Sequence, residues 1–299
     1  MAYHRPVLLT ESIEGLNIKP EGIYVDLTFG GGGHAREVLE NLGKRGRLYA
    51  FDQDQGAEKN VEEDNRLVFI GSNFRYMQNF LRYYGISKVD GILADLGISS
   101  HQIDRPERGF SFRADSRLDM RMNTSSRKTA IDVLNSTPEE GLYPIFREYG
   151  ELKNTGRIVR AITAARKESP IETTGQLEAA LGNLVPQQNR SMFLARVYQA
   201  IRIEVNEEID ALREMLIQTT DYMASGGRLV VITYHSLEDR LVKNFMRTGN
   251  TEGTLKKDFY GNPETSWKQI NRKVIVPGEE EIAENSRARS AKLRIAEKI

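Results

Sequence analysis

The chain has 299 residues, 39% hydrophobic and 28% charged, with 42 Lys+Arg against 42 Asp+Glu. This length suits one large domain or two, and zero net charge means that a nucleic-acid partner would need a local basic patch. The chain has no cysteine, which excludes disulfides, Cys-based zinc sites and thiol nucleophiles, and we find no membrane-spanning run or signal-peptide pattern. We therefore expect a cytoplasmic protein with no membrane and no metal.

The first third of the chain alternates short apolar runs with amphipathic stretches. The apolar runs predict strands at 22–29, 47–52, 66–72 and 89–97. Their near-continuous apolar character is typical of parallel strands that are covered on both faces. The amphipathic stretches predict helices near 34–42, 55–63 and 74–84. Strands alternating with helices predict an α/β fold with a doubly wound, mostly parallel sheet.

The pattern changes after Asp104. The chain is charged and irregular over 105–123, and 129–202 predicts helices without any strand. The α/β pattern then returns, with helices expected at 206–224 and 236–247 and strands at 226–234, 268–277 and 290–299. We predict one discontinuous α/β domain, 1–104 and 205–299, interrupted by a helical insertion at 105–204.

Four glycines, Gly30 to Gly33, follow the first predicted strand. Glycine permits positive φ and close approach of the backbone to a ligand, and doubly wound sheets bind cofactors at such turns. Asp52 ends the second strand, 20 residues past Gly32, where an acidic side chain accepts hydrogen bonds from ribose hydroxyls. Both features fit NAD and S-adenosylmethionine equally well.

Seven segments, in this order along nearly the whole chain, closely resemble the MraW/RsmH family of bacterial small-subunit ribosomal RNA methyltransferases. They are "HRPVLLTE" (4–11), "DLTFGGGGH" (26–34), "ADLGISSHQID" (94–104), "RGFSF" (108–112), "LDMRM" (118–122), "YHSLEDRLVK" (234–243) and "RARSAKLR" (287–294). The resemblance implies a class I (Rossmann-like) fold with a helical insertion. It also implies S-adenosylmethionine-dependent methylation of the exocyclic N4 amine of one cytidine in the decoding region of 16S rRNA. Ser286 departs from the proline usual in the family, which affects only the local turn.

By the same resemblance, seven residues bind the cofactor: Gly32, Gly33, His34, Asp52, Phe74, Asp95 and Gln102. The glycines would let the backbone approach the methionine moiety, and His34 would open a helix and donate to a carboxylate. Asp52 would take the ribose, Phe74 would lie against adenine, and Asp95 would face the cationic side of the cofactor. Gln102 would lie at the rim. Taken singly, Phe74 also fits a core residue and Gln102 a surface amide.

The substrate side of the site is expected at the ends of the fourth and fifth strands. Amine methyltransferases often carry Asp/Asn/Ser-Pro-Pro-aromatic at the fourth strand, where this chain reads "DLGI", so a flipped base must stack elsewhere. Phe110, Phe112 and Tyr234 are the candidate stacking residues. We predict Asp95, Tyr234 and His235 as catalytic residues, with Asp95 as hydrogen-bond acceptor and His235 accepting or relaying a proton.

The alternative for His235 is a structural role at a helix start. In that interpretation the histidine bonds to backbone, Ser236 is the N-cap, and Asp239 caps back.

Two segments are locally basic. Residues 286–299 hold five Lys/Arg and one acid, a net of +4, with Arg287, Arg289, Lys292 and Arg294 as candidate RNA contacts. Residues 104–128 hold seven Lys/Arg and four acids, a net of +3. We expect the insertion and the C-terminal segment to bind RNA, although such clusters are often only solvated faces.

The expected partner is small-subunit rRNA within an assembled or nearly assembled subunit, and a homodimer is compatible with the sequence. Two other functions remain open at this point. One is an NAD-dependent oxidoreductase on the same sheet. The other is a non-catalytic RNA-binding assembly factor with a vestigial cofactor site.

Overall fold

The computed structural model describes residues 6–261 and 264–299, so the first two residues of the 4–11 motif lie outside it. The chain divides into two compact units. We call Met1–Gly97 with Ile209–Ile299 the sheet unit, and Ile98–Glu208 the helical unit. The helical unit is longer at both ends than the predicted 105–204 insertion. Its first helix already begins at Ser100, and its last continues to Asn206.

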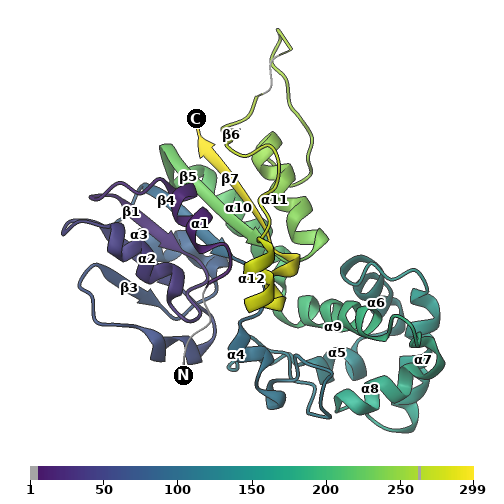
Figure 1. Ribbon diagram of the computed structural model, residues 1–299. Helices are drawn as coiled ribbons and strands as arrows, with labels where there is room; N and C mark the ends of the chain where they lie inside the picture. The colour runs from purple at the N-terminus through teal and green to yellow at the C-terminus, as the bar shows by residue number, and fades with distance from the viewer. Residues whose placement is uncertain (1–5, 262–263) are drawn as a thin grey trace. The chain divides into compact units, whose positions relative to one another are not determined.

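The sheet unit contains one seven-stranded sheet. Its strands are β1 (Ile23–Asp26), β2 (Arg47–Phe51), β3 (Leu67–Ile70), β4 (Val89–Asp95), β5 (Met223–Thr233), β6 (Trp267–Gln269) and β7 (Lys292–Lys298). Their order is β3-β2-β1-β4-β5-β7-β6 (Figure 1). The pairs among β1 to β5 are parallel, whereas β7 pairs antiparallel with both β5 and β6. The predicted doubly wound, mostly parallel sheet is confirmed.

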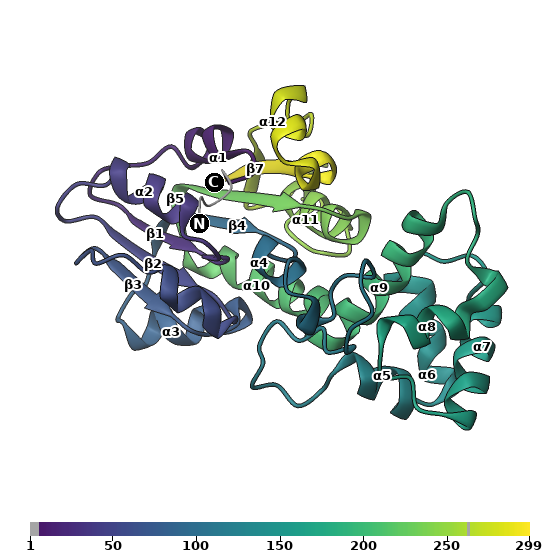
Figure 2. The ribbon, with the colours of Figure 1, turned by 60° about the horizontal axis from the view of Figure 1, so that its bottom comes forward.

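Helices cover both faces of this sheet (Figures 1 and 2). They are α1 (Leu9–Leu16), α2 (Gly33–Asn41), η1 (Gln55–Asn60), η2 (Phe74–Tyr76), α3 (Met77–Tyr83), α10 (Glu208–Tyr222), α11 (Ser236–Thr248), α12 (Glu279–Glu284) and η6 (Ser286–Ser290). Leu16 of α1 and Val38 of α2 belong to the apolar core on one face. Leu81, Leu212 and Phe245, from α3, α10 and α11, belong to the core on the other.

Two predicted elements of the sheet unit differ in the structure. The helix expected near 55–63 is a 3₁₀ helix that ends at Asn60. The strand expected over 268–277 is the three-residue β6, because the chain turns after Gln269. The turn is fixed by Asn271, whose side chain donates to the carbonyl of Leu293 at 3.0 Å and accepts from the N–H of Ile295 at 2.7 Å.

The helical unit has a core of its own, and its described residues form no strand beyond an isolated bridge between Arg117 and Thr173. Its helices are α4 (Ser100–Ile103), η3 (Pro106–Arg108), α5 (Ala130–Ser136), α6 (Glu139–Pro144), the π-helix η4 (Ile145–Tyr149), α7 (Thr155–Glu168), α8 (Thr174–Leu181), η5 (Gly182–Leu184) and α9 (Arg190–Asn206). In the ranges that the structure describes, no helix combines the length and the apolarity needed to cross a membrane.

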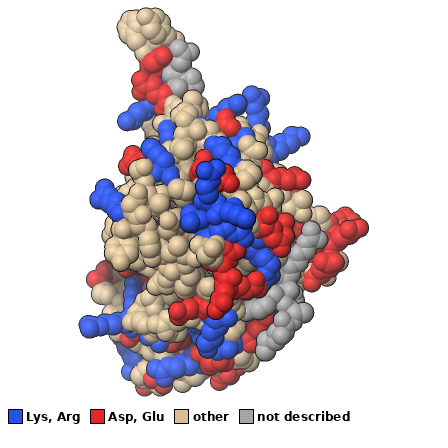
Figure 3. All heavy atoms as spheres, turned by 90° about the vertical axis from the view of Figure 1, so that its left-hand side faces the viewer, with Lys and Arg blue, Asp and Glu red and all other residues tan. Residues whose placement is uncertain are grey.

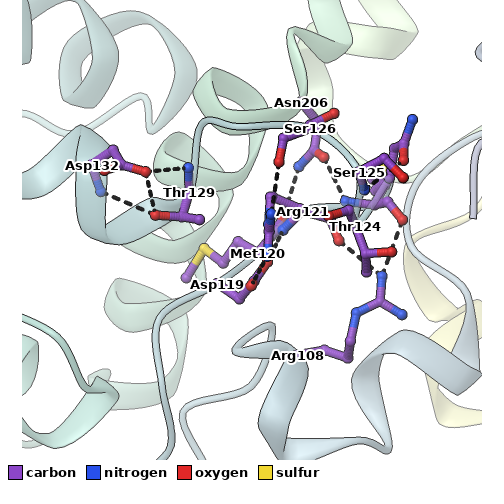
Figure 4. Close-up of polar contacts among 12 residues, drawn as sticks. Arg108, Asp119, Met120, Arg121, Thr124, Ser125, Ser126, Thr129, Asp132 and Asn206 are labelled. Carbon is purple, nitrogen blue, oxygen red and sulfur yellow. Dashed lines mark hydrogen bonds and ion pairs between the residues drawn. The ribbon is translucent and has the colours of Figure 1, made fainter.

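Polar contacts fix the irregular segment before α5 (Figure 4). Arg121 forms a two-pronged ion pair with Asp119, with N···O distances of 2.8 and 2.7 Å. Arg108 donates to the carbonyls of Arg121 and Met122 at 2.8 and 3.1 Å. The Asn206 side chain accepts from the N–H of Met122 at 2.7 Å. Two arginines of this basic segment therefore hold the loop itself together.

Candidate active site

The glycine loop begins where β1 lies between β2 and β4. The N–H of Leu27 donates to the carbonyl of Leu93 at 2.9 Å, and the N–H of Phe29 donates to the carbonyl of Phe51 at 2.8 Å. The chain therefore leaves β1 bonded first to one neighbouring strand and then to the other. This is the switch point at which doubly wound sheets bind ligands.

Backbone conformation and crowding explain the glycines of this loop. Gly30 and Gly32 have φ of 52° and 76°, values that side-chain-bearing residues rarely adopt. A Cβ on Gly32 would lie 2.9 Å from Cζ of Phe29, and one on Gly33 would lie 2.2 Å from Cγ of Pro6. A side chain at Gly32 or Gly33 would therefore collide with Phe29 or Pro6 unless the loop moved. Contact of these two glycines with a cofactor stays a prediction.

Asp52 lies at the end of β2 and faces the glycine loop. Its carboxylate accepts the N–H of Gly30 at 2.7 Å and the N–H of Asp54 at 2.8 Å. Burial raises the pKa of Asp52 to about 6. A carboxylate has about four acceptor positions, so these two bonds leave capacity for ribose hydroxyls. The ribose role of Asp52 stays a prediction.

Asp95 and Tyr234 meet beside the loop. The hydroxyl of Tyr234 donates to Oδ1 of Asp95 at 2.8 Å, and the N–H of Asp95 donates to Oγ1 of Thr28 at 2.6 Å. Burial raises the pKa of Asp95 to about 7. Burial, followed by the Asp95 charge, raises the pKa of Tyr234 well above its ordinary value. Tyr234 therefore stays protonated and donates, whereas Asp95 titrates near neutral pH.

His34 is buried at the start of α2, with 6% of its surface exposed. Nε2 lies 3.2 Å from the carbonyl oxygen of Val7, which can only accept, so Nε2 carries the proton. Burial lowers the pKa of His34 to about 4, so the ring is neutral at pH 7. The ring therefore has no proton left for a cofactor carboxylate, so the predicted donation from His34 would come from its backbone N–H and stays a prediction.

The other nitrogen of this ring, Nδ1 of His34, lies 3.9 Å from Oδ2 of Asp95. In the neutral tautomer Nδ1 is an acceptor, and an ionised carboxylate oxygen is one too. Two acceptors at this distance would both be satisfied by an N–H donor, such as an amine.

His235 is the N-cap of α11, and its side chain accepts the backbone N–H of Glu238, as the alternative prediction of a helix-start histidine bonded to backbone expects. The part of that alternative that named Ser236 as the N-cap is wrong. The reciprocal partner is Glu238, whose carboxylate accepts the N–H groups of Tyr234 and His235 at 2.8 and 3.3 Å. Glu238 is also 3.1 Å from Nε2 of His235. Asp239, the expected capping residue, instead pairs with Arg294. A catalytic role for His235 stays a prediction.

The remaining predicted residues lie elsewhere in the two units. Phe74, in η2, is partly buried against the core of the sheet unit. Gln102 belongs to the helical unit and closes the N-cap of α4, where its side-chain oxygen accepts the N–H of Ser99 at 3.1 Å. Phe110 is buried in the helical core, and Phe112 packs edge-on against Tyr198 with centroids 5.3 Å apart. The cofactor and RNA roles of these residues stay predictions.

The C-terminal basic residues are not equivalent. Arg294 is only 8% exposed, and its Nε lies 2.7 Å from Oδ1 of Asp239. Nζ of Lys292 lies 3.5 Å from Oδ2 of the same carboxylate. Arg289 is exposed and Arg287 is half-buried. The structure thus favours a structural role for Arg294 and leaves Arg289 as the most accessible candidate for RNA.

Asp26, the last residue of β1, is a buried carboxylate that the sequence did not single out. It is 1% exposed; Oδ1 accepts the N–H of Thr28 at 3.0 Å, and Oδ2 has no hydrogen-bond partner among the described residues. Burial raises its pKa to about 7. The sequence pattern placed Asp26 inside the predicted strand 22–29, whereas the structure ends β1 at this residue, as β2 ends just before Asp52.

Comparison with known proteins identifies the family. The model of the MraW methylase family matches residues 1–299 of the chain. This chain belongs to the MraW methylase family. A protein from Phocaeicola vulgatus is 57% identical over 296 residues, which are 99% of this chain and 97% of that protein. One from Christiangramia forsetii is 54% identical over 299 residues, 100% and 99% of the two chains. Both are named ribosomal RNA small subunit methyltransferase H.

Membership of the MraW methylase family decides between the cofactors that the glycine loop left open. The protein is a class I methyltransferase. Its cofactor is therefore S-adenosylmethionine, the methyl donor, and not NAD. The site fits this cofactor. Gly32 and Gly33 keep the loop free of side chains, Asp52 retains acceptor capacity, and the Asp95–His34 pair presents acceptors toward a cationic or amine-bearing group.

Proposed function

We propose that this protein methylates the exocyclic N4 amine of one cytidine in the decoding region of 16S rRNA, in the cytoplasm. The observation that carries the proposal is the Tyr234–Asp95 pair beside the glycine loop. Its carboxylate, that of Asp95, is a hydrogen-bond acceptor with a pKa of about 7. The names of the close relatives support small-subunit rRNA as the substrate.

Residues of the sheet unit would hold the cofactor, which supplies an electrophilic methyl group when bound. The backbone of Gly32, Gly33 and His34 would receive the methionine moiety at the N-terminus of α2. Asp52 would accept hydrogen bonds from the ribose, and Phe74 would lie against adenine.

The cytosine amine is a poor nucleophile because its lone pair is delocalised into the ring. The site must therefore align this lone pair with the methyl group and accept the proton that the amine loses. Asp95 has the pKa for this role, because a base that titrates near pH 7 is both available and strong enough to act. Tyr234 orients Asp95 through Oδ1, which leaves Oδ2 for the amine. His235 would contribute to proton transfer from the neighbouring helix start.

The helical unit and the C-terminal basic segment would bind the RNA. In α7, Arg157, Arg160 and Lys167 are exposed at helical spacings that put them on one face. In the C-terminal segment, Arg289 is exposed. These cations replace the buried or loop-holding arginines, such as Arg294, as the best candidates for phosphate contacts.

The test is methyl transfer from labelled S-adenosylmethionine to small subunits isolated from cells that lack this methylation. We expect one labelled nucleoside, N4-methylcytidine, from one position. The matched control is the same subunit with that cytidine replaced by uridine, which should take up no label. Label on a different base or a different atom would contradict the proposal, and free 16S rRNA in parallel shows whether an assembled subunit is required.

A further inference from the structure

A long loop joins α11 to β6, and we call its described residues, 249–261 and 264–266, the arm. In Figures 1 and 3 the arm extends away from the body of the sheet unit. Local bonds order its described part. The Asn250 side chain donates to the carbonyl of Thr254 at 2.7 Å, and the N–H of Glu264 donates to the carbonyl of Lys256 at 2.9 Å. The Asp258 side chain accepts the N–H of Tyr260 at 2.9 Å.

The end of the arm carries two aromatic rings in water. Phe259 is 98% exposed and Tyr260 is 85% exposed, and their rings meet edge-on with centroids 5.6 Å apart. Most large apolar side chains of the chain are buried in its three core clusters. A pair of rings presented to solvent at the end of an ordered loop contributes nothing to the core and is instead suited to contact a partner.

A row of cations lies beside the base of the arm on α11, which exposes Arg240, Lys243 and Arg247 at spacings that share one helix face. The arm itself is not basic, because Lys256 and Lys257 are outnumbered by Glu252, Asp258 and Glu264. Nη2 of Arg247 lies 3.4 Å from the carbonyl oxygen of Gly253, which brings this face to the arm.

The acidic residues of α11 do not offset these cations on the outer face. Glu238 is buried in the helix cap, with 3% of its surface exposed. Asp239 is paired with Arg294 and Lys292. The charged groups that α11 exposes are therefore all positive.

Flat rings in solvent beside a row of cations are the two elements with which proteins hold single-stranded nucleic acid. Bases stack on the rings and phosphates lie along the cations. We propose that the arm and the outer face of α11 bind a single-stranded segment of RNA, with bases on Phe259 and Tyr260 and phosphates along Arg240, Lys243 and Arg247. The identification of that RNA as part of the ribosomal substrate rests on the proposed function.

The first test measures affinity for a fluorescent 12-residue oligouridine. Phe259→Ala with Tyr260→Ala should weaken binding by about tenfold or more, the scale of one lost stacked base. The matched control is Tyr83→Ala, because Tyr83 is an 81% exposed ring in α3. Unchanged affinity in the double variant, or an equal loss in the control, would overturn the proposal. A variant with both Lys243→Gln and Arg247→Gln should bind the oligouridine with a weaker salt dependence. The slope of log affinity against log salt concentration should fall in magnitude by about 0.7 for each lost phosphate contact.

A second test reports stacking directly. The chain has one tryptophan, Trp267, which is 2% exposed and therefore shielded from an added oligonucleotide. In a Phe259→Trp variant, oligouridine should quench the new indole emission, whereas wild-type emission should hardly change. No quenching at saturating oligonucleotide would contradict stacking. Light scattering compares the oligomeric state of the wild-type protein with that of the Phe259→Ala, Tyr260→Ala variant. A different oligomeric state in the variant would overturn the proposal and show that the arm binds a second copy of the chain instead.

Methyl transfer to small subunits separates this inference from the proposed function. If the wild-type protein methylates cytidine and the arm variant does so with unchanged KM, the arm inference fails alone. If the wild-type protein modifies no rRNA but the arm still binds oligouridine, the proposed function fails alone.

Discussion

The hydroxyl of Tyr234 donates to Oδ1 of Asp95 at 2.8 Å and thereby ties the end of β5 to the end of β4. Gly97 supports this pair from the other side. It has φ of 100°, and a Cβ there would lie 3.3 Å from Cδ2 of the Tyr234 ring. The "DLG" at the end of the fourth strand therefore supplies both the carboxylate and the space that its partner ring needs.

Gly97→Ala should slow methyl transfer by about tenfold or more, because it displaces the ring that orients Asp95. The matched control is Gly85→Ala. Gly85 has a similar positive φ of 71°, but a Cβ added there would meet nothing within 4 Å. Both variants should lose about 1–2 kcal/mol of stability from backbone strain. Single-turnover transfer with both substrates saturating makes the comparison, and equal rates in the two variants would show that the Gly97–Tyr234 contact is unimportant.

Asp52→Ala should weaken S-adenosylmethionine binding by about 1.5–3 kcal/mol, the scale of hydrogen bonds to a charged group. Titration calorimetry measures the affinity. Asp64→Ala serves as control, because it removes a carboxylate that pairs with Arg66 rather than with the glycine loop. A folded Asp52→Ala protein with normal affinity would refute the ribose assignment.

Asp26 should make the protein less stable as pH rises. Its folded pKa is raised to about 7, so between its unfolded pKa near 4 and pH 7 the folded state holds a proton that the unfolded state releases. Stability is therefore fully present below pH 4 and is lost progressively up to about pH 7. Asp26→Asn should reduce the loss between pH 5 and pH 8 by about 2 kcal/mol. Denaturant unfolding at pH 5 and at pH 8 measures the free energy of unfolding of the wild-type protein and of the variant. An equal loss of stability between the two pH values in both proteins would contradict the burial argument.

Arg289 and Arg294 should respond differently to neutralisation. Arg289→Gln removes an exposed cation and should flatten the salt dependence of RNA binding without changing stability. Arg294→Gln leaves Asp239 with a weaker partner in a half-buried site and should cost about 3 kcal/mol of stability. Thermal unfolding and RNA titrations on both variants decide between the roles. If the Arg294→Gln protein kept its stability but bound RNA with a weaker salt dependence, Arg294 would be an RNA contact and not a structural residue.

The fold was largely predictable from the sequence, because parallel strands buried on both faces leave near-continuous apolar runs such as 47–52 and 89–97. Local bonding was less predictable. The N-cap of α11 is His235 and not Ser236, because the buried carboxylate of Glu238 accepts the N–H groups of Tyr234 and His235. The sequence pattern alone did not indicate this role of Glu238. The pairing of Arg294 with Asp239 joins residues distant in sequence, so charge counting alone assigned Arg294 to RNA.

The pH dependence of single-turnover transfer to the target cytidine tests the role of Asp95 most directly. Burial raises the Asp95 pKa to about 7, so the wild-type rate should rise through about pH 7 as the carboxylate ionises, and then level. Tyr234→Phe removes a hydrogen bond that favours the ionised form, so the rise should move to higher pH. Asp95→Asn should be slower by about 10²-fold or more and show no such rise, with both substrates bound. An Asp95→Asn enzyme that keeps the wild-type rate and profile would contradict the account.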